Sequence, residues 1–199
     1  MNLHLASTYL KGRGIDPDTA TAARLGVVTS PELGHEHCLG RLVIPYVDML
    51  GVYALKFRCL EHDDCKTVGC SKYMSPTGQE TSIYGVLDCD STEGTIHITE
   101  GELDRLILKQ VFGEPVAGVP GVQNWKVHYP FHFSGFERVL IWPDGDKAGA
   151  DLANKIQHQV RNAEVVSVPK GMDVTELFLS VGAEVMRQMV GEDDGEEND

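Results

Sequence analysis

The fold class is clearest in one short stretch, Ile96-His97-Ile98-Thr99-Glu100-Gly101-Glu102-Leu103-Asp104. Its first four residues predict a short buried strand, and Leu103 opens an apolar series at helical spacing that runs to Val111. Glu100 therefore stands where a strand ends and a helix begins. Open α/β sheets bind their ligands at that edge, so we expect the carboxylate of Glu100 to lie in a functional site.

A second apolar run, Val139-Leu140-Ile141-Trp142, repeats the pattern further along the chain. It leads into Pro143-Asp144-Gly145-Asp146-Lys147-Ala148-Gly149 and another amphipathic segment. Asp144 and Asp146 are two residues apart in extended chain, so they point to the same side. Together with Glu100 they bring three carboxylates to two strand ends, and hard divalent cations prefer such oxygen ligands.

These acids form a pattern, Glu100-Gly101-x-x-Asp104 followed by Asp144-Gly145-Asp146-x-x-Gly149, that resembles the Toprim signature of primases, topoisomerases and related nucleases. Upstream motifs look like those of the RNA-polymerase core of DnaG-type bacterial and phage primases, in the same order. The resemblance covers nearly the whole chain except its tail. The upstream motifs are Tyr9-Leu10-Lys11-Gly12-Arg13-Gly14-Ile15, Arg41-Leu42-Val43-Ile44-Pro45 leading to Asp48-x-x-Gly51 and Arg58, and Lys72-Tyr73-Met74-Ser75-Pro76.

The resemblance implies an α/β fold in two subdomains. Residues 1–92 are expected to form a mixed α+β subdomain whose first part, residues 1–30, is helical. Residues 93–190 are expected to form a Toprim catalytic subdomain, a mostly parallel sheet flanked by helices. The cluster Asp90-Ser91-Thr92-Glu93-Gly94 is typical of a linker and supports this boundary. Residues 191–199 carry 6 acids and no base, a composition that predicts a disordered tail.

The resemblance also assigns a catalytic centre for nucleotidyl transfer. Two Mg²⁺ or Mn²⁺ ions would bridge the phosphates of an incoming nucleotide and the attacking 3′ oxygen. The implied catalytic residues are Glu100, Asp104, Asp144 and Asp146, and the implied metal ligands are Glu100, Asp144, Asp146 and Asp173.

Two of these assignments carry a reservation from the sequence itself. Asp104 lies in the first turn of the predicted helix, where a helix cap or a surface charge remains an alternative. Asp173 matches an acidic position after which the family commonly has a second acid two residues on. This chain has Thr175 there, so one ligand of the second metal is missing.

A predicted strand over Val52–Arg58 carries the clearest basic groups. Lys56 and Arg58 share one face of it, and Lys72 and Tyr73 follow the next loop. Such groups can hold a phosphate and stack a base. An ordinary solvated strand face is the alternative, and the resemblance favours contact with nucleotide or template.

The loop between these groups holds four soft metal ligands, Cys59, His62, Cys65 and Cys70. A structural zinc would make this loop rigid. The spacing is not one of the usual paired knuckles, and no second ligand pair stands at a distance. From the sequence we therefore favour an ordinary reduced loop over a zinc site.

Composition bounds the class of protein. The chain has 199 residues, 42% of them hydrophobic, and no apolar run long enough for a membrane span. Its five cysteines, an odd number, fit a reducing cytoplasm better than a disulfide framework. The formal net charge is −13, yet residues 1–72 balance 8 basic against 8 acidic residues. The acid excess therefore lies in the predicted metal-binding half and the tail.

The resemblance implies a DNA primase that makes short RNA primers from NTPs on single-stranded DNA, in the cytoplasm of a bacterial host if phage-encoded. Its relatives usually add an N-terminal zinc ribbon and a helicase or helicase-binding domain. We therefore expect separate partners, a zinc-ribbon polypeptide and a replicative helicase. The alternatives are a metal-dependent Toprim nuclease and a non-catalytic DNA-binding scaffold of the recombination-mediator type.

Overall fold

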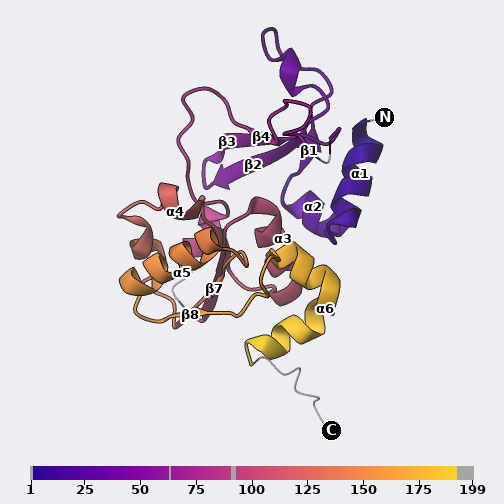
Figure 1. Ribbon diagram of the computed structural model, residues 1–199. Coiled ribbons are helices and arrows are strands. Elements are labelled where there is room, and N and C mark those ends of the chain that lie inside the picture. The colour runs from indigo at the N-terminus through magenta and orange to yellow at the C-terminus, as the bar shows by residue number, and fades with distance from the viewer. Residues whose placement is uncertain (1, 63, 91–92, 192–199) are drawn as a thin grey trace.

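The computed structural model describes residues 2–62, 64–90 and 93–191, and these contain two four-stranded sheets (Figure 1). One sheet is antiparallel, in the order β1-β2-β3-β4, and lies at the top of Figure 1. The other has the order β6-β5-β7-β8, and all its pairs are parallel. The predicted α/β class is confirmed. The predicted tail, apart from Gly191, lies outside the described residues.

The N-terminal segment is helical and then turns into a strand. Helix α1 spans Asn2–Gly12, and α2 spans Pro17–Ala22 after the N-cap Asp16. The helical prediction for this region is wrong at its end, where β1 (Gly26–Val27) pairs with β2. The physical reason is local: Arg24 takes a left-handed φ of 53°, which ends the helical course, and the next residues find hydrogen-bond partners in β2.

The predicted hairpin forms the centre of the antiparallel sheet. Strands β2 (Leu42–Asp48) and β3 (Gly51–Arg58) are joined by a tight turn in which Asp48 Oδ1 accepts the N–H of Gly51 at 3.1 Å. Gly51 has φ +125°, a conformation that favours glycine. Strand β4 (Tyr73–Met74) pairs with the end of β3, so the long loop between them begins and ends at the same place.

The parallel sheet places two strand ends side by side. Thr99, the last residue of β5, is paired with Trp142, the last residue of β7. The segments that follow, beginning with Glu100 and Pro143, therefore leave the sheet at the same edge, as the sequence predicted. In sheet order the strands are β6 (Val116–Gly118), β5 (Thr95–Thr99), β7 (Arg138–Trp142) and β8 (Ala163–Val165).

Helices cover both faces of the parallel sheet. Alternate residues of β7 enter two different cores, one built with α3 and α6 and one built with α5, and the apolar residues of β5 enter the second. Helix α6 bends at Gly182, whose φ is 78°. The helices are α3 (Glu102–Phe112), α4 (Gly121–Asn124), α5 (Lys147–Gln159) and α6 (Val174–Met189), with 3-10 turns η1 (Glu36–Cys38), η2 (Val86–Asp90) and η3 (Tyr129–His132).

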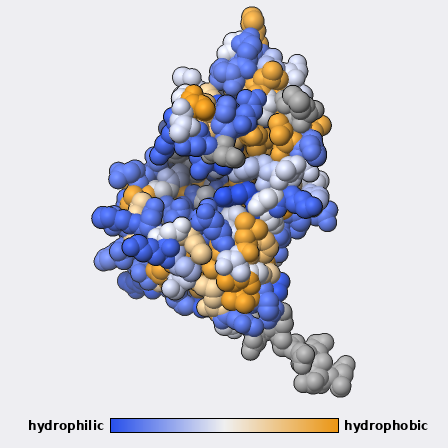
Figure 2. Space-filling view, turned by 45° about the vertical axis from the view of Figure 1, so that its right-hand side comes forward, coloured by the Kyte–Doolittle hydropathy of each residue, from blue (hydrophilic) through white to orange (hydrophobic). Residues whose placement is uncertain are grey.

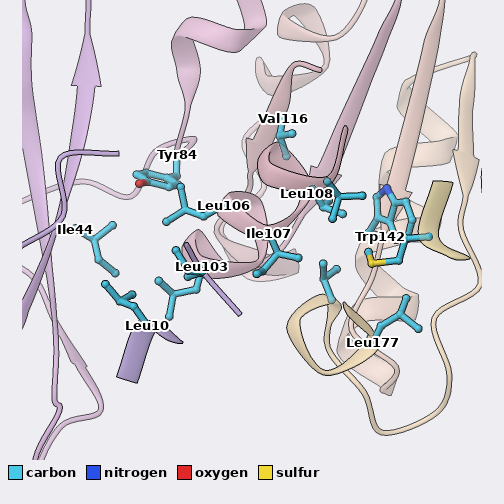
Figure 3. Close-up of a cluster of buried hydrophobic side chains, with 14 of the residues drawn as sticks. Leu10, Ile44, Tyr84, Leu103, Leu106, Ile107, Leu108, Val116, Trp142 and Leu177 are labelled. Atoms are coloured by element: carbon cyan, nitrogen blue, oxygen red, sulfur yellow. The ribbon is translucent and has the colours of Figure 1, made fainter. Parts of the chain in front are cut away.

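Helix α3 is the centre of the larger core (Figure 3). Leu103 and Leu106 pack toward the antiparallel sheet, in one cluster with Ile44 and Tyr84, while Ile107 lies toward α6. The helix is thus buried on several sides, and each fully buried leucine or isoleucine contributes about 1.5–3 kcal/mol. It joins the two sheets into one body.

A polar chain crosses this core beside the sheet. The indole N–H of Trp142 donates to His97 Nδ1 at 3.0 Å, and His97 Nε2 lies 2.7 Å from Glu114 Oε2. The ring of Phe112 stacks on His97 at 4.3 Å. The buried imidazole is therefore paired at both nitrogens.

The aromatic stretch before β7 fills the second core. Trp125 and Phe133 are buried with stacked rings 6.0 Å apart, and Tyr129 is buried beside them. The Trp125 indole donates to Gln159 Oε1 at 2.9 Å, which ties the stretch to the end of α5. These aromatic residues pack the core and do not form a base-stacking surface.

The surface is mixed in character. In Figure 2 hydrophobic side chains gather near the upper end and below the middle of the visible face, with hydrophilic side chains between them. Within the part of the chain that the structure describes, no helix has the length and apolar character to cross a membrane.

The substitution Ile107→Ala tests whether α3 holds the two sheets together. Ile107 is fully buried, so we expect a loss of about 2–5 kcal/mol in the free energy of unfolding, measured by urea denaturation. Leu179→Ala on α6, where the side chain is 55% exposed, is the matched control and should change stability little. Equal losses in the two variants would contradict this account of the core.

Candidate active site

Glu100 and Asp144 meet at the shared edge of β5 and β7. Glu100 Oε1 accepts the backbone N–H of Asp144 at 3.2 Å, and both side chains are partly buried. The contact requires a glycine at position 149, because a Cβ there would collide with the Asp144 carbonyl oxygen and come within 2.8 Å of Glu100 Oε1. The predicted convergence of these two acids is therefore present in the structure.

The site concentrates negative charge in a poorly solvated place. Burial, followed by the nearby charges of Glu100 and Asp104, raises the pKa of Asp144 to about 7. Burial also raises the pKa of Glu100. Asp144 Oδ1 is buried and has no hydrogen-bond partner among the described residues. A buried carboxylate oxygen without a donor fits a cation ligand, so these residues suit the implied divalent metal.

Asp104 is an internal group of the site and not a surface charge. It is 7% exposed, and its Oδ1 accepts two hydrogen bonds from Thr175, from the hydroxyl at 2.6 Å and from the N–H at 3.1 Å. A Cβ at Gly101 would collide with the other Asp104 oxygen. Burial raises the pKa of Asp104, and the charge of Asp173 raises it as well. The N-cap of α3 is Gly101, so the alternative of a helix cap does not hold.

Asp146 and Asp173 both cap helices. Asp146 is exposed and caps α5, its Oδ1 accepting the N–H of Gly149 at 2.9 Å. Asp173 caps α6 in a reciprocal arrangement with Glu176, and its Oδ2 lies 3.3 Å from Arg13 Nη2. Capping uses one oxygen of Asp146. Both oxygens of Asp173 have protein partners, which weakens the prediction that Asp173 is a metal ligand without excluding it.

The acids line an open site and do not form a closed cage. Electrostatic interaction reaches Asp144 from Glu100, Asp104, Asp146 and Asp173. Their oxygens are not all within direct ligand distance of one another: in the described ranges, only a Cys/His group has three ligand atoms within 4.8 Å of one another. Mg²⁺ usually keeps several waters and takes one or two carboxylates, so this spacing suits it.

A hollow of about 470 Å³ opens beside the acids, in the size range of small-molecule sites. Its lining includes Asp144, Asp146 and Lys170. Acids, a base and backbone groups thus border a space that can receive an anionic ligand carrying its own cations.

Three of the predicted basic and aromatic groups, Lys56, Arg58 and Tyr73, lie together. Lys56 Nζ and Arg58 Cζ each lie 4.9 Å from the centre of the Tyr73 ring, and Arg58 also lies 4.8 Å from that of Tyr9. Burial raises the pKa of Tyr73 to about 12. Lys72 is exposed on the same connection. The prediction that Lys56 and Arg58 project together is confirmed.

Lys56 is not a free charge, and this differs from the sequence-based expectation. Its Nζ lies 2.5 Å from Glu102 Oε1, and the Tyr46 hydroxyl donates to the same oxygen at 2.6 Å. Glu102 is 7% exposed. A buried carboxylate without a partner is costly, so Lys56 has a structural task as well as any contact with ligand.

Sequence reasoning missed four residues that shape this site: Glu102, Thr175, Tyr9 and Arg13. Thr175 stands out in the sequence only as the place of a missing acid, and Tyr9 and Arg13 only as part of a motif. Tyr9 and Arg13 are four residues apart in the quoted N-terminal motif, which places both on one face of a helix. The charge of Asp104 acts on both of them, and Arg13 pairs with Asp173. Tyr9 on α1 and Arg13, which directly follows this helix, therefore lie near the acids, and Arg13 brings a positive charge to them.

The cysteine loop between β3 and β4 brings together three of its four predicted ligands. His62 Nδ1 lies 3.6 Å from Cys59 Sγ and 3.5 Å from Cys70 Sγ, and the two sulfurs are 3.9 Å apart. Burial opposes ionisation of Cys59, but backbone N–H groups and His62 hydrogen-bond its sulfur and lower its pKa to about 6. Cys65 is buried next to them.

Comparison with known proteins shows to which family the chain belongs. No protein-family model matches it. The gene 57 protein of Mycobacterium phage D29 is 33% identical over 156 residues, which are 76% of this chain and 98% of that protein. The chain belongs to the family of this phage protein.

Solved structures show which fold this phage family has. A DnaG catalytic core has a TM-score of 0.73 at 21% identity, over 94% of this chain and 72% of its own. A DnaG primase catalytic domain bound to single-stranded DNA has a TM-score of 0.71 at 19% identity, over 94% and 70%. The primase fragment of the bacteriophage T7 primase-helicase has 0.67 at 22%, over 91% and 73%. The chain has the DnaG catalytic-core fold, as its motifs predicted.

The raised pKa of Asp144 predicts how stability of this phage-family protein depends on pH without metal. The pKa of Asp144 is about 7 in the folded protein and near 4 in the unfolded chain. Its protonated form therefore stabilises the fold fully below about pH 4, and this stabilisation is lost as the pH rises through about 7. In EDTA above neutral pH, Asp144→Asn should raise the free energy of unfolding by roughly 1–2 kcal/mol, discounted for partial exposure.

Urea denaturation across this pH range measures the effect. Added Mg²⁺ should reduce the difference, because bound cation stabilises the wild-type carboxylate. Asp151→Asn, on the exposed side of α5, is the control and should show no such pH dependence. A flat difference between Asp144→Asn and wild type across the range would contradict the assignment.

Thr175→Val tests the support of Asp104. Losing the hydroxyl removes a hydrogen bond from a buried carboxylate, so we expect the free energy of unfolding to fall by about 1–3 kcal/mol at neutral pH. Thr175→Ser keeps the hydroxyl and should recover most of this loss. A valine variant as stable as the wild type would show that Asp104 does not depend on Thr175.

Proposed function

We propose that this protein is the catalytic core of a DNA primase, which synthesises short RNA primers on single-stranded DNA from NTPs during phage DNA replication. The observation that carries the proposal is the pair Glu100 and Asp144, held together at two adjacent strand ends with Asp144 Oδ1 buried and unpartnered. This pair lies in a chain with the DnaG catalytic-core fold and a phage relative. Primer synthesis is a nucleotidyl transfer, the reaction that such a carboxylate site serves.

The proposed metal ligands are Glu100, Asp144 and Asp146. Bound Mg²⁺ or Mn²⁺ would offset phosphate charge and favour ionisation of the attacking 3′ hydroxyl. Asp146 offers its exposed carboxylate, and the backbone contact of Asp144 orients Glu100. Asp104 orients the site from inside through Thr175. Asp173 would join only by giving up its contact with Arg13, so we place it last among the ligands.

The proposed template and nucleotide contacts are Arg58, Lys72, Lys56 and Tyr73. Lys72 is exposed and available to a phosphate. Tyr73 has two cations near its ring and is largely buried, so its proposed role is to hold Lys56 and Arg58 in place instead of stacking a base. The DnaG structure solved with single-stranded DNA supports such a ligand for this fold.

We also propose that the protein works with a replicative helicase. The T7 neighbour is the primase fragment of a primase-helicase protein, which supports this partner class. The separate zinc-ribbon partner expected from the sequence stays a prediction. A pull-down with the host or phage helicase would test the first of these.

Ribonucleotide incorporation on single-stranded DNA tests the primase function. With Mg²⁺ or Mn²⁺ and NTPs we expect short RNA products from the wild type, and Asp144→Asn and Glu100→Gln should each lower the rate on the order of 10²-fold or more. Asp151→Asn is the matched control, since Asp151 is exposed on α5 and paired with Lys147, outside the site. It should keep the wild-type rate.

Two outcomes would replace the proposal. Incorporation indifferent to Asp144→Asn and Glu100→Gln would favour the scaffold alternative. Metal-dependent cutting of DNA without NTPs, lost in the same variants, would favour the nuclease alternative, which the same carboxylates can serve.

A further inference from the structure

The loop between β3 and β4 is closed by hydrogen bonds between its two ends, and it contributes no residue to the carboxylate site. Cys59, at its start, donates its backbone N–H to Lys72 O at 3.0 Å, so the two ends of the loop are hydrogen-bonded. Within it, Cys70 donates to Cys65 O at 2.9 Å, and Gly69 takes φ +69°. These backbone contacts bring side chains from the two ends of the loop to one point.

Three ligand atoms at that point have the spacing of a zinc coordination sphere. With Zn–S near 2.3 Å and Zn–N near 2.0 Å, tetrahedral geometry puts two sulfurs about 3.8 Å apart and sulfur and nitrogen about 3.5 Å apart. The observed Cys59–Cys70 distance is 3.9 Å, and His62 Nδ1 lies 3.6 and 3.5 Å from the two sulfurs. All three edges match within about 0.2 Å, the tolerance expected for a metal site.

Cys65 is the best-placed fourth ligand. It is buried in the same loop, its Sγ lies 3.6 Å from the His62 carbonyl oxygen, and its thiol interacts with both Cys59 and Cys70. The other candidate is His37, which borders the hollow next to Cys59, His62 and Cys70 but comes from a different segment.

We propose that Cys59, His62, Cys65 and Cys70 bind one structural Zn²⁺ ion. Three thiolates and one imidazole with no open position are typical of a structural site and not of a catalytic one. The sequence alone favoured a reduced loop because the spacing is not one of the usual paired knuckles and no second ligand pair stands at a distance. The backbone shows instead that one short loop can wrap around a single ion.

The ion would fix the segment that carries the basic groups. Cys59 directly follows Arg58, and Cys70 stands two residues before Lys72, so the ion clamps the end of β3 to the start of β4. The loop contributes few apolar side chains to either core, so little else holds it. A role in placing Arg58 and Lys72 for the template rests on the proposed function, whereas zinc binding does not.

Metal analysis of the reduced full-length chain tests the site. We expect about one zinc per chain by mass spectrometry, and a loss of about tenfold or more in zinc content for Cys59→Ser and Cys70→Ser. The matched controls are Cys38→Ser and Cys89→Ser, because both cysteines are buried and lie outside the loop. These controls should keep the full zinc content.

Cobalt substitution identifies the ligand set. The sulfur-to-cobalt charge-transfer band should have the intensity of three thiolates and should fall by about one third in Cys65→Ser. His37→Ala should leave it unchanged. A band with the intensity of only two thiolates that Cys65→Ser does not reduce would overturn the assignment of the fourth ligand.

Limited trypsin digestion gives a readout that does not depend on enzyme activity. Lys66 is exposed in the middle of the loop, and chelation of zinc should speed cleavage there by about tenfold or more while the rest of the chain stays resistant. A reduced wild-type chain without zinc, or equal zinc loss in Cys38→Ser and Cys59→Ser, would overturn the proposal. A protein that binds zinc but makes no primers would contradict the proposed function and leave the zinc site standing.

Discussion

Two carboxylates are held side by side against their mutual repulsion, and the rest of the molecule is arranged to allow it. Glu100 and Asp144 meet because β5 and β7 run parallel and end in register. Burial raises the pKa of both groups, and the charge of Glu100 raises the pKa of Asp144 further. The fold supplies the stability for this arrangement from elsewhere, chiefly from the apolar core around α3.

The two sheets contribute opposite charges to the site. The parallel sheet supplies acids, while the N-terminal helix and the antiparallel sheet supply Arg13, Lys56 and Arg58. Two ion pairs cross between these halves, Arg13 with Asp173 and Lys56 with Glu102. The cations thus pair with Asp173 and Glu102, whereas Glu100, Asp144 and Asp146 have no ion pair within the described residues and remain the acids that we propose as metal ligands. This division of roles places basic groups in an otherwise acidic protein, where the proposed contact with nucleic acid needs them.

The sequence allowed much of this architecture to be predicted, and the reasons are local. Strand periodicity and the Glu-Gly and Asp-Gly-Asp motifs located Glu100, Asp144 and Asp146 at one edge, because parallel strands end on the same side. The sequence could not show that Lys56 pairs with Glu102, since that contact joins β3 to α3, two elements far apart in the chain. Nor could spacing alone show that Cys59, His62 and Cys70 meet at one point, which depends on the backbone turns of their loop. The β1 strand was missed because its two residues gain order only by pairing with β2.

The buried chain of Trp142, His97 and Glu114 has a consequence for strand alignment. Because His97 Nδ1 accepts the indole proton, its own proton must sit on Nε2 facing Glu114, so a single tautomer is selected. A shift of β5 by one residue in register would turn the His97 side chain to the opposite face of the sheet. The indole N–H of Trp142 would then be buried without a hydrogen-bond acceptor. The hydrogen bonds of Trp142, His97 and Glu114 therefore stabilise one register of β5 against β7. In that register Glu100 and Asp144 leave the sheet side by side.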